Sequence, residues 1–209
     1  MIRRLSKDPG MLKKYGEILQ EQERRGFIEK VTVETNSTDN RIHYIPHHPV
    51  FKKDSNTTPV RIVYDCSCKM SPEHLSLNDC LMSTPLVLNE LSKILLRFRL
   101  NRFAITTDIK KAFLHVGLCE EDRDVTRFLR LRNPLDVKSP LTTYRFKAIL
   151  FGATCSPFIL NATLLKHLQR SENKTAKLLE QDLYVDNILT SVNDENDAVT
   201  YFKESRFDK

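Results

Sequence analysis

Residues 183–190, Leu-Tyr-Val-Asp-Asn-Ile-Leu-Thr, contain an Asp-Asn pair between two short apolar segments. This pattern predicts a tight antiparallel hairpin with its turn at Asp186 and Asn187, because asparagine tolerates the left-handed backbone geometry of such turns. Another apolar segment, residues 103–107 (Phe-Ala-Ile-Thr-Thr), ends directly at Asp108. We therefore expect Asp186 at the tip of a hairpin and Asp108 at the end of a buried strand.

The two strand-end aspartates suggest a cation site. A carboxylate at the end of a buried strand is poorly solvated and needs a partner, such as an arginine, capping amides or a metal ion. If the strands are adjacent, Asp108 and Asp186 converge, and an oxygen-rich site of this kind selects Mg²⁺ or Mn²⁺. The alternative is that Asp108 caps the following helix and that Asp186 and Asn187 form an ordinary turn.

The composition is that of a globular protein. Of the 209 residues, 40% are hydrophobic and 29% are charged, which suits one large or two small domains and excludes a mainly disordered or collagen-like chain. No apolar run approaches the roughly eighteen residues of a membrane span, and residues 1–9 lack the apolar core of a secretory signal. With five cysteines and no export signal, we expect free thiols in an intracellular protein, in cytoplasm or nucleus, without a membrane partner.

The net charge of +6 is unevenly distributed along the chain. Residues 1–176 carry 29 basic and 19 acidic side chains, whereas residues 177–209 carry 4 basic and 8 acidic ones. A basic body with an acidic end suits a polyanionic partner beside a carboxylate site for cations. The alternative is a basic protein with no such partner.

Helices are expected in five places, one of them a helical stretch from Lys174 to Glu180. Asp8 and Pro9 predict the start of a helix that ends at Gly26, and Ser156-Pro157 predicts the start of another that runs to about Leu168. A helix from Pro85 to about Arg99 is expected to bury Leu86, Leu91, Ile94, Leu95 and Phe98. In a last helix, over 194–205, Val199 and Phe202 are expected to point inward.

Strands are expected among these helices without a regular alternation. Residues 126–131 and 142–147 alternate in polarity and are expected to pair as antiparallel strands. Because strands and helices are mixed without a repeating β-α pattern, the sequence favours an α+β fold.

Several motifs together resemble those of reverse transcriptases. Residues 184–187, Tyr-Val-Asp-Asn, resemble the Tyr-x-Asp-Asp box, and residues 107–113, Thr-Asp-Ile-Lys-Lys-Ala-Phe, resemble the first aspartate motif. Residues 151–157, Phe-Gly-Ala-Thr-Cys-Ser-Pro, resemble the loop-helix motif between them, and residues 43–50 and 61–65 resemble the fingers region. His47-His48-Pro49, Tyr64-Asp65-Cys66-Ser67 and Leu77-Asn78-Asp79 add similarity to the BEL/Pao retrotransposon lineage, which then spans about residues 10–195.

The resemblance implies a right-hand polymerase that copies an RNA or DNA template, with a primer, from deoxynucleoside triphosphates. Residues 1–26 would be an N-terminal helix leading into fingers at 27–100. Residues 101–209 would be an incomplete palm, an antiparallel sheet backed by helices, with part of the fingers inserted around 118–147. The thumb would be absent, so the chain is expected to be a truncated copy or a fragment of a polyprotein.

The resemblance also implies roles for individual residues. Asp108, Asp186 and Asn187 would form the catalytic box, and Asp108, Asp186 and the carbonyl of Ile109 would bind Mg²⁺ or Mn²⁺. Lys52, Lys53, Arg61, Phe113 and Gly152 would contact the nucleotide, and Ser156, Pro157 and Tyr184 would contact nucleic acid. The ring of Phe113 would exclude a ribose 2′-hydroxyl, whereas the alternatives are a core aromatic for Phe113 and a solvated loop for the two lysines.

Asn187 is the main departure from the family pattern, which has a second aspartate there. Asparagine keeps an oxygen but removes a charge close to the cations, a loss of a few kcal/mol or roughly 10²- to 10⁴-fold in rate. We therefore expect weak or no activity from the isolated chain. The alternatives are a catalytically dead remnant that still binds nucleic acid, and an unstable remnant with no function.

Overall fold

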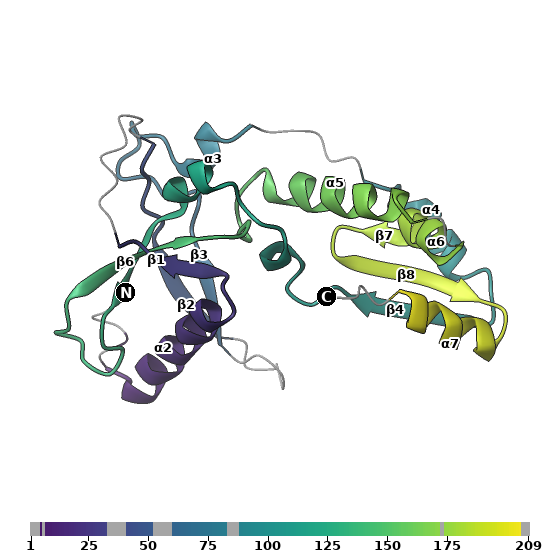
Figure 1. The fold of residues 1–209 in the computed structure, drawn as a ribbon, viewed down its shortest axis with the longest axis horizontal. Helices are drawn as coiled ribbons and strands as arrows, with labels where there is room; N and C mark the ends of the chain where they lie inside the picture. The colour runs from purple at the N-terminus through teal and green to yellow at the C-terminus, as the bar shows by residue number, and fades with distance from the viewer. Residues whose placement is uncertain are drawn as a thin grey trace. The chain divides into compact units, whose positions relative to one another are not determined.

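The computed structural model describes residues 5, 7–32, 41–51, 60–82, 88–171 and 174–205. It divides into two compact units, of which the first comprises residues 1–83 and 113–156 and the second comprises residues 84–112 and 157–209. Each unit combines antiparallel sheet with helices, as expected (Figure 1). None of the helices in the described ranges has the length and hydrophobicity needed to cross a membrane. The boundaries of fingers and palm stay a prediction.

The first unit contains a three-stranded sheet in the order β1-β6-β5 and a two-stranded sheet of β2 and β3. Its elements are α2 (Pro9–Arg24), β1 (Ile28–Lys30), β2 (His47–Phe51), β3 (Val60–Tyr64), α3 (Leu77–Cys80), the 3₁₀ helix η2 (Glu120–Thr126), β5 (Phe128–Leu131) and β6 (Leu141–Phe146). The expected antiparallel pairing of the two alternating segments is confirmed, with Phe128 opposite Tyr144.

Helix α2 begins and ends as its sequence indicates. The side chain of Asp8 accepts a hydrogen bond of 3.0 Å from the Met11 N–H, and Pro9 occupies the first turn, where no N–H donor is needed. After the helix, Gly26 adopts φ 74°, a left-handed conformation that costs glycine little. The predicted helix is therefore confirmed at both ends.

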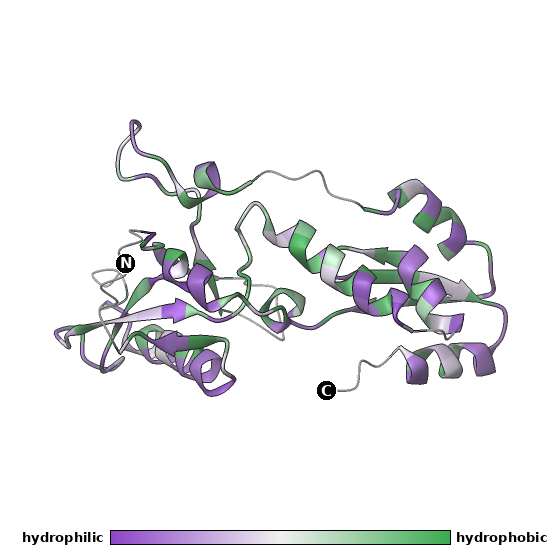
Figure 2. Ribbon diagram, turned by 45° about the horizontal axis from the view of Figure 1, so that its top comes forward, coloured by the Kyte–Doolittle hydropathy of each residue, from purple (hydrophilic) through white to green (hydrophobic). Residues whose placement is uncertain are grey.

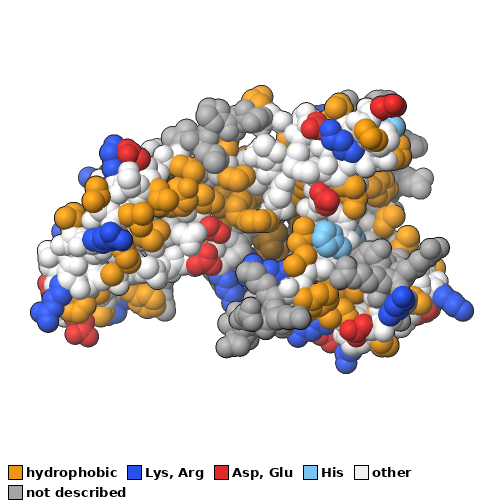
Figure 3. All heavy atoms as spheres, turned by 180° about the vertical axis from the view of Figure 1, so that it is seen from behind, with side chains coloured by type: hydrophobic (Ala, Val, Ile, Leu, Met, Phe, Trp, Pro, Cys, Tyr) orange, Lys and Arg blue, Asp and Glu red, His pale blue; other side chains and the backbone are white. Residues whose placement is uncertain are grey.

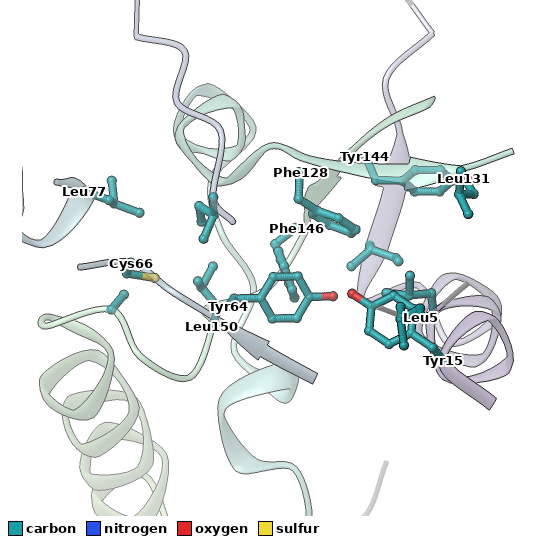
Figure 4. Close-up of a cluster of buried hydrophobic side chains, with 14 of the residues drawn as sticks. Leu5, Tyr15, Tyr64, Cys66, Leu77, Phe128, Leu131, Tyr144, Phe146 and Leu150 are labelled. Atoms are coloured by element: carbon teal, nitrogen blue, oxygen red, sulfur yellow. The ribbon is translucent and has the colours of Figure 1, made fainter. Parts of the chain in front are cut away.

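Aromatic side chains fill the core of the first unit (Figure 4). The ring of Tyr64 lies edge-on to Phe146 and Phe128, with centroid distances of 4.7 and 5.2 Å. The imidazole of His47 stacks between the rings of Tyr15 and Tyr64 and is hydrogen-bonded to the Tyr15 hydroxyl. Burial lowers the pKa of His47, so the ring is neutral at pH 7 and packs as a core side chain. His47 is thus a core residue of this unit.

Gly16 of α2 gives a test of this packing. A Cβ atom on Gly16 would lie 2.3 Å from Cβ of Pro134, whose ring cannot rotate away. Gly16→Ala should therefore destabilise the protein by about 1–3 kcal/mol from overpacking, although alanine favours helix by about 1 kcal/mol. Gly10→Ala in the same helix is the matched control, because its Cβ would meet only the Asp8 side chain at 3.5 Å. Thermal unfolding should show a lower midpoint for Gly16→Ala alone, and equal midpoints would contradict the packing.

The second unit is built around a three-stranded antiparallel sheet in the order β4-β8-β7. Its elements are α4 (Leu91–Phe98), β4 (Phe103–Asp108), α5 (Ser156–Gln169), α6 (Lys174–Asp182), β7 (Leu183–Tyr184), β8 (Asn187–Val192) and α7 (Glu195–Glu204). The short 3₁₀ helix η1 (Ala112–His115) follows β4 and leads into the first unit, and α5 begins at Ser156, the last residue of that unit.

One face of this sheet packs against helices. The buried cluster joins Ile105 and Ile188 of the sheet to residues of α5, α6 and α7, including Leu168, Leu179 and Tyr201. In Figure 2, the strands of this unit are largely hydrophobic (green), whereas α7 is mostly hydrophilic (purple). Because side chains alternate along a strand, Thr106 and Asp108 of β4 project from the other face, where they are exposed. The expectation that Asp108 ends a buried strand is wrong, because every residue of β4 is half-buried or exposed.

Two expectations about buried helix faces are wrong. Many hydrophobic side chains of the protein are exposed to solvent, and Figure 3 shows such side chains on one face. Leu91 and Leu95 of α4, which were expected to be buried, are about 40% exposed. Only Ile94 of that helix is fully buried, and the helix begins at Leu91, while residues 83–87 lie outside the described ranges. In α7, Tyr201 points inward, and Val199 and Phe202 are exposed.

Candidate functional site

The end of β4 and the β7–β8 turn meet at one end of the second unit's sheet. Strand β4 pairs with β8 along its whole length, and the register sets Asp108 opposite Asn187. Beyond the strand, the N–H of Ile109 donates to the carbonyl of Asp186 at 2.8 Å. Asp108, Asp186 and Asn187, the predicted catalytic box, are therefore brought together within a single unit.

The turn that carries Asp186 differs from the expected one by one residue. Tyr184 pairs with Asn187, so the two turn residues are Val185 and Asp186, whereas we expected Asp186 and Asn187. This register sets Leu183 opposite Ile188 and buries both side chains in the core cluster. Burial of this pair therefore decides the register, rather than the tolerance of asparagine for turns.

Val185 adopts the left-handed conformation in this turn. Its φ of 59° is unfavourable for a β-branched residue, and it stands at the first of the two turn positions. Such backbone strain persists only where the surrounding structure enforces it, and strained residues cluster at functional sites. The pairing of β8 with both β4 and β7 supplies that enforcement here.

The site combines two neighbouring carboxylates with one neutral amide. Burial raises the pKa of Asp186, and the nearby negative charge of Asp108 raises it further. The side-chain N–H of Asn187 donates to Oδ1 of Asp186 at 2.9 Å, so the asparagine satisfies one carboxylate oxygen without supplying charge. Across the described residues, no cluster of three or more His, Cys, Asp or Glu side chains forms a ready metal site. The site therefore consists of two carboxylates and one amide.

Two other residues of the second unit have roles predicted at this site. The carbonyl of Ile109 accepts a hydrogen bond of 3.0 Å from the N–H of Ala112, which leaves it one lone pair for a cation. The side chain of Tyr184 is half-buried on β7, next to the turn. Their predicted roles stay predictions.

The start of β7, the strand that leads to Asp186, is held by the side chains of two residues that no sequence pattern indicated. Arg97 of α4 donates through Nε to Oδ1 of the buried Asp182 at 2.9 Å and also contacts the carbonyl of Gln181. The side-chain amide of Asn89 donates to the carbonyls of Glu180 and Leu183 at 2.7 and 3.0 Å. These partners lie more than 80 residues apart in the chain, so no local sequence pattern could have indicated them.

The predicted sugar-contacting residue, Phe113, belongs to the first unit. Its side chain is only 7% exposed, and its ring lies edge-on to Phe151 with a centroid distance of 5.2 Å. Phe151 is 74% exposed, so it is the ring of this pair that meets solvent. Phe151 is therefore a further candidate functional residue, for which the motif at residues 151–157 predicted no role.

The other residues predicted to contact the nucleotide also lie in the first unit or outside the described ranges. Arg61 is exposed on β3, opposite Val50. Gly152 adopts φ 107°, and a Cβ there would lie 3.2 Å from the carbonyl of Tyr64, so close packing of the chain on itself already requires glycine. Lys52 and Lys53 lie outside the described residues.

Ser156 and Pro157 begin α5, as expected. The side chain of Ser156 is 1% exposed, and its N–H donates to the carbonyl of Ala153 at 3.0 Å. Its contact with nucleic acid, like that of Pro157, stays a prediction.

The architecture was compared with those of known proteins. No protein-family profile and no curated protein sequence matches the chain. Among solved structures, the chain is similar to the native protease-reverse transcriptase of prototype foamy virus, with a TM-score of 0.61 and 18% identity. The selenomethionine-labelled CSH mutant of that protein gives 0.61 and 17%. The chain has a retroviral-type reverse transcriptase fold.

The matched region is a much larger fraction of this chain than of the foamy virus chains. The match covers 90% of this chain but only 20% of each foamy virus chain. The chain therefore spans about a fifth of the length of these viral proteins. Nearly all of it nonetheless takes part in the reverse transcriptase fold.

Proposed function

We propose that the chain is the fingers and palm portion of a reverse transcriptase of the BEL/Pao type, which carries out template-directed nucleotidyl transfer. The observation that carries the proposal is the meeting of Asp108 and Asp186 at one end of the second unit's sheet. The fold similarity to a viral reverse transcriptase supports it, as does the order of the sequence motifs. The partners would be a primed RNA or DNA template and deoxynucleoside triphosphates, inside the cell, with the rest of a polyprotein supplying further domains.

The donor atoms of the site fit a divalent cation. Carboxylate oxygens of Asp108 and Asp186, together with the carbonyl of Ile109, are the ligand types that Mg²⁺ and Mn²⁺ prefer. Asn187 contributes less, because its N–H group is directed at Asp186. A bound cation would offset the negative charge of the nucleotide phosphates as they approach these carboxylates.

The family resemblance also implies that residues of the first unit bind and select the nucleotide. The exposed guanidinium of Arg61 suits the triphosphate, because charge-assisted hydrogen bonds to phosphate are strong and guanidinium matches its geometry. The ring of Phe113 would exclude a ribose 2′-hydroxyl by steric contact. One of Lys52 and Lys53 would also hold the triphosphate.

Asn187 favours a second candidate function, a nucleic-acid-binding protein without catalysis. The hydrogen bond from Asn187 occupies one lone pair of Oδ1 of Asp186, and the asparagine supplies a neutral amide where the family pattern has a negative charge. A protein of this kind would still bind nucleic acid through the excess of basic side chains in residues 1–176.

The two functions are separated by measuring primer-template binding and primer extension on the same protein. Binding of a fluorescent oligo(dT)–poly(A) duplex should weaken steeply, by roughly 10³-fold for six phosphate contacts, between 50 and 200 mM salt. Under the enzymatic function, Mn²⁺ supports weak dTTP incorporation that Asp108→Asn abolishes without changing duplex binding. Binding without incorporation supports the second function, and absence of salt-dependent binding contradicts both.

A further inference from the structure

The side chain of Asn78 connects three parts of the first unit. Its Nδ2 donates to Oγ of Ser67 at 2.9 Å and to the carbonyl of Gly152 at 3.0 Å. Its Oδ1 accepts a hydrogen bond of 2.9 Å from the N–H of Thr154. The amide thus uses both its donor and its acceptor side, and it grips the 152–154 loop from two directions.

Asn78 is itself held in place by its surroundings. Its backbone N–H donates to the carbonyl of Cys66 at 3.0 Å. In the same short helix, Ser76 and Asp79 cap each other reciprocally, and Asp79 pairs with Lys69 at 2.7 Å. The amide therefore extends from a rigid support onto the loop rather than following the loop's movements.

The loop that Asn78 contacts directly follows an exposed aromatic residue of the first unit. Phe151 directly precedes Gly152, its side chain is 74% exposed, and it lies edge-on to the buried Phe113. Its position depends chiefly on the backbone of residues 151–154, where Asn78 donates one hydrogen bond to Gly152 and accepts one from Thr154.

We infer that Asn78 is a positioning residue that holds the 152–154 loop and thereby sets the position of the Phe151 ring against the ring of Phe113. The consequence for catalysis rests on the proposed function. If the chain binds a nucleotide, the rings of Phe113 and Phe151 select its sugar, and Phe151 is the ring that the nucleotide contacts from solvent. Asn78 then affects sugar selectivity without touching the nucleotide.

A tryptophan in place of Phe151 provides a direct reporter of the loop, because the natural chain contains no tryptophan. In the full chain with Phe151→Trp, the steady-state fluorescence anisotropy measures how firmly the ring is held. We expect Asn78→Ala to lower the anisotropy most. Asn78→Asp should lower it less, because the carboxylate still accepts from the Thr154 N–H but cannot donate to Gly152.

The same proteins report on nucleotides. We expect dATP with Mn²⁺ to quench the tryptophan and to bind more tightly than ATP. Asn78→Ala should reduce that preference by about fivefold, a change the size of the net free energy of a single hydrogen bond. The matched control is Asn101→Ala, which removes an amide that donates to the Ser191 carbonyl at 2.9 Å in the second unit. It should change neither the anisotropy nor the preference.

Each outcome decides between the inference and the function on which it rests. Unchanged anisotropy in both Asn78 variants would overturn the positioning role. Reduced anisotropy in the Asn78 variants, combined with no response to dATP or ATP in any protein, would uphold the positioning role and contradict the proposed function. If circular dichroism shows that Asn78→Ala does not fold, the comparison rests on Asn78→Asp.

Discussion

Asn187→Asp is expected to tighten Mn²⁺ binding by about 100-fold and to raise primer extension by roughly 10²- to 10⁴-fold. The substitution replaces a neutral amide with a third negative charge beside Asp186 and Asp108, and a few kcal/mol of added attraction corresponds to these factors. It also removes the N–H that occupies Oδ1 of Asp186. Titration with Mn²⁺ followed by electron paramagnetic resonance measures the affinity, and primer extension measures the rate.

Thermal unfolding gives an independent check on the same substitution. Without a cation, Asn187→Asp should lower the unfolding midpoint, because it sets like charges side by side and removes a hydrogen bond. With Mn²⁺, the midpoint should rise more than in the natural protein, since a ligand that binds only the folded state stabilises it. Asn193→Asp adds the same charge at an exposed position beyond the far end of β8 and is the control. Equal responses in the two variants would contradict a local effect at the site.

Arg97→Met is expected to destabilise the protein by about 3–5 kcal/mol. Asp182 lies in the core with its side chain 3% exposed, and loss of the guanidinium at 2.9 Å leaves a buried carboxylate without its cation. Since Asp182 directly precedes β7, the loss also loosens the strand that leads to Asp186. Denaturant unfolding of the natural and variant proteins measures the change.

A double-mutant cycle separates the ion pair from simple loss of packing. Asp182→Asn removes the buried charge, so Arg97→Met should cost much less in that background than in the natural protein. Arg99→Met, at an exposed position after α4, should change stability by no more than about 0.5 kcal/mol. A cost for Arg97→Met no greater than that for Arg99→Met would show that the ion pair does not anchor β7.

Local features of the fold were predictable from the sequence because their causes are local. Asp8 and Pro9 start α2 through a side-chain cap, and the alternation of residues 142–147 gives a strand. The meeting of Asp108 with Asp186 was also predictable, because each aspartate ends an apolar strand segment. Such signals involve residues a few positions apart, and the physical chemistry of caps, turns and alternation acts at that range.

Features decided by distant partners were not predictable. The turn at Val185 and Asp186 follows from burial of Leu183 against Ile188, which overrides the preference of asparagine for the turn. The hydrogen bond from Asn78 to the carbonyl of Gly152 joins residues that are 74 positions apart, although each of them lies in a motif that the sequence analysis identified from nearby residues. A pattern along the chain marks such residues as notable but does not say which atoms they contact.

The pH dependence of cation binding follows from the state of Asp186. A carboxylate must be deprotonated to bind a metal ion, and burial, with the charge of Asp108, raises the pKa of Asp186. Protons should therefore compete with a cation at a higher pH than they would for an ordinary aspartate, and the Mn²⁺ affinity measured by electron paramagnetic resonance should fall as the solution is acidified. In Asp108→Asn, the pKa of Asp186 should be lower, and the loss of affinity on acidification should shift to lower pH.

The central claim is that Asp108 and Asp186 act on one common cation. Mn²⁺ affinities of the natural protein, Asp108→Asn, Asp186→Asn and the double variant test this most directly. The account predicts that each single substitution weakens binding at least tenfold, the usual scale for a metal ligand or its close neighbour, and that the double variant is little weaker than either. Single substitutions without effect, or effects that simply add, would contradict a shared cation.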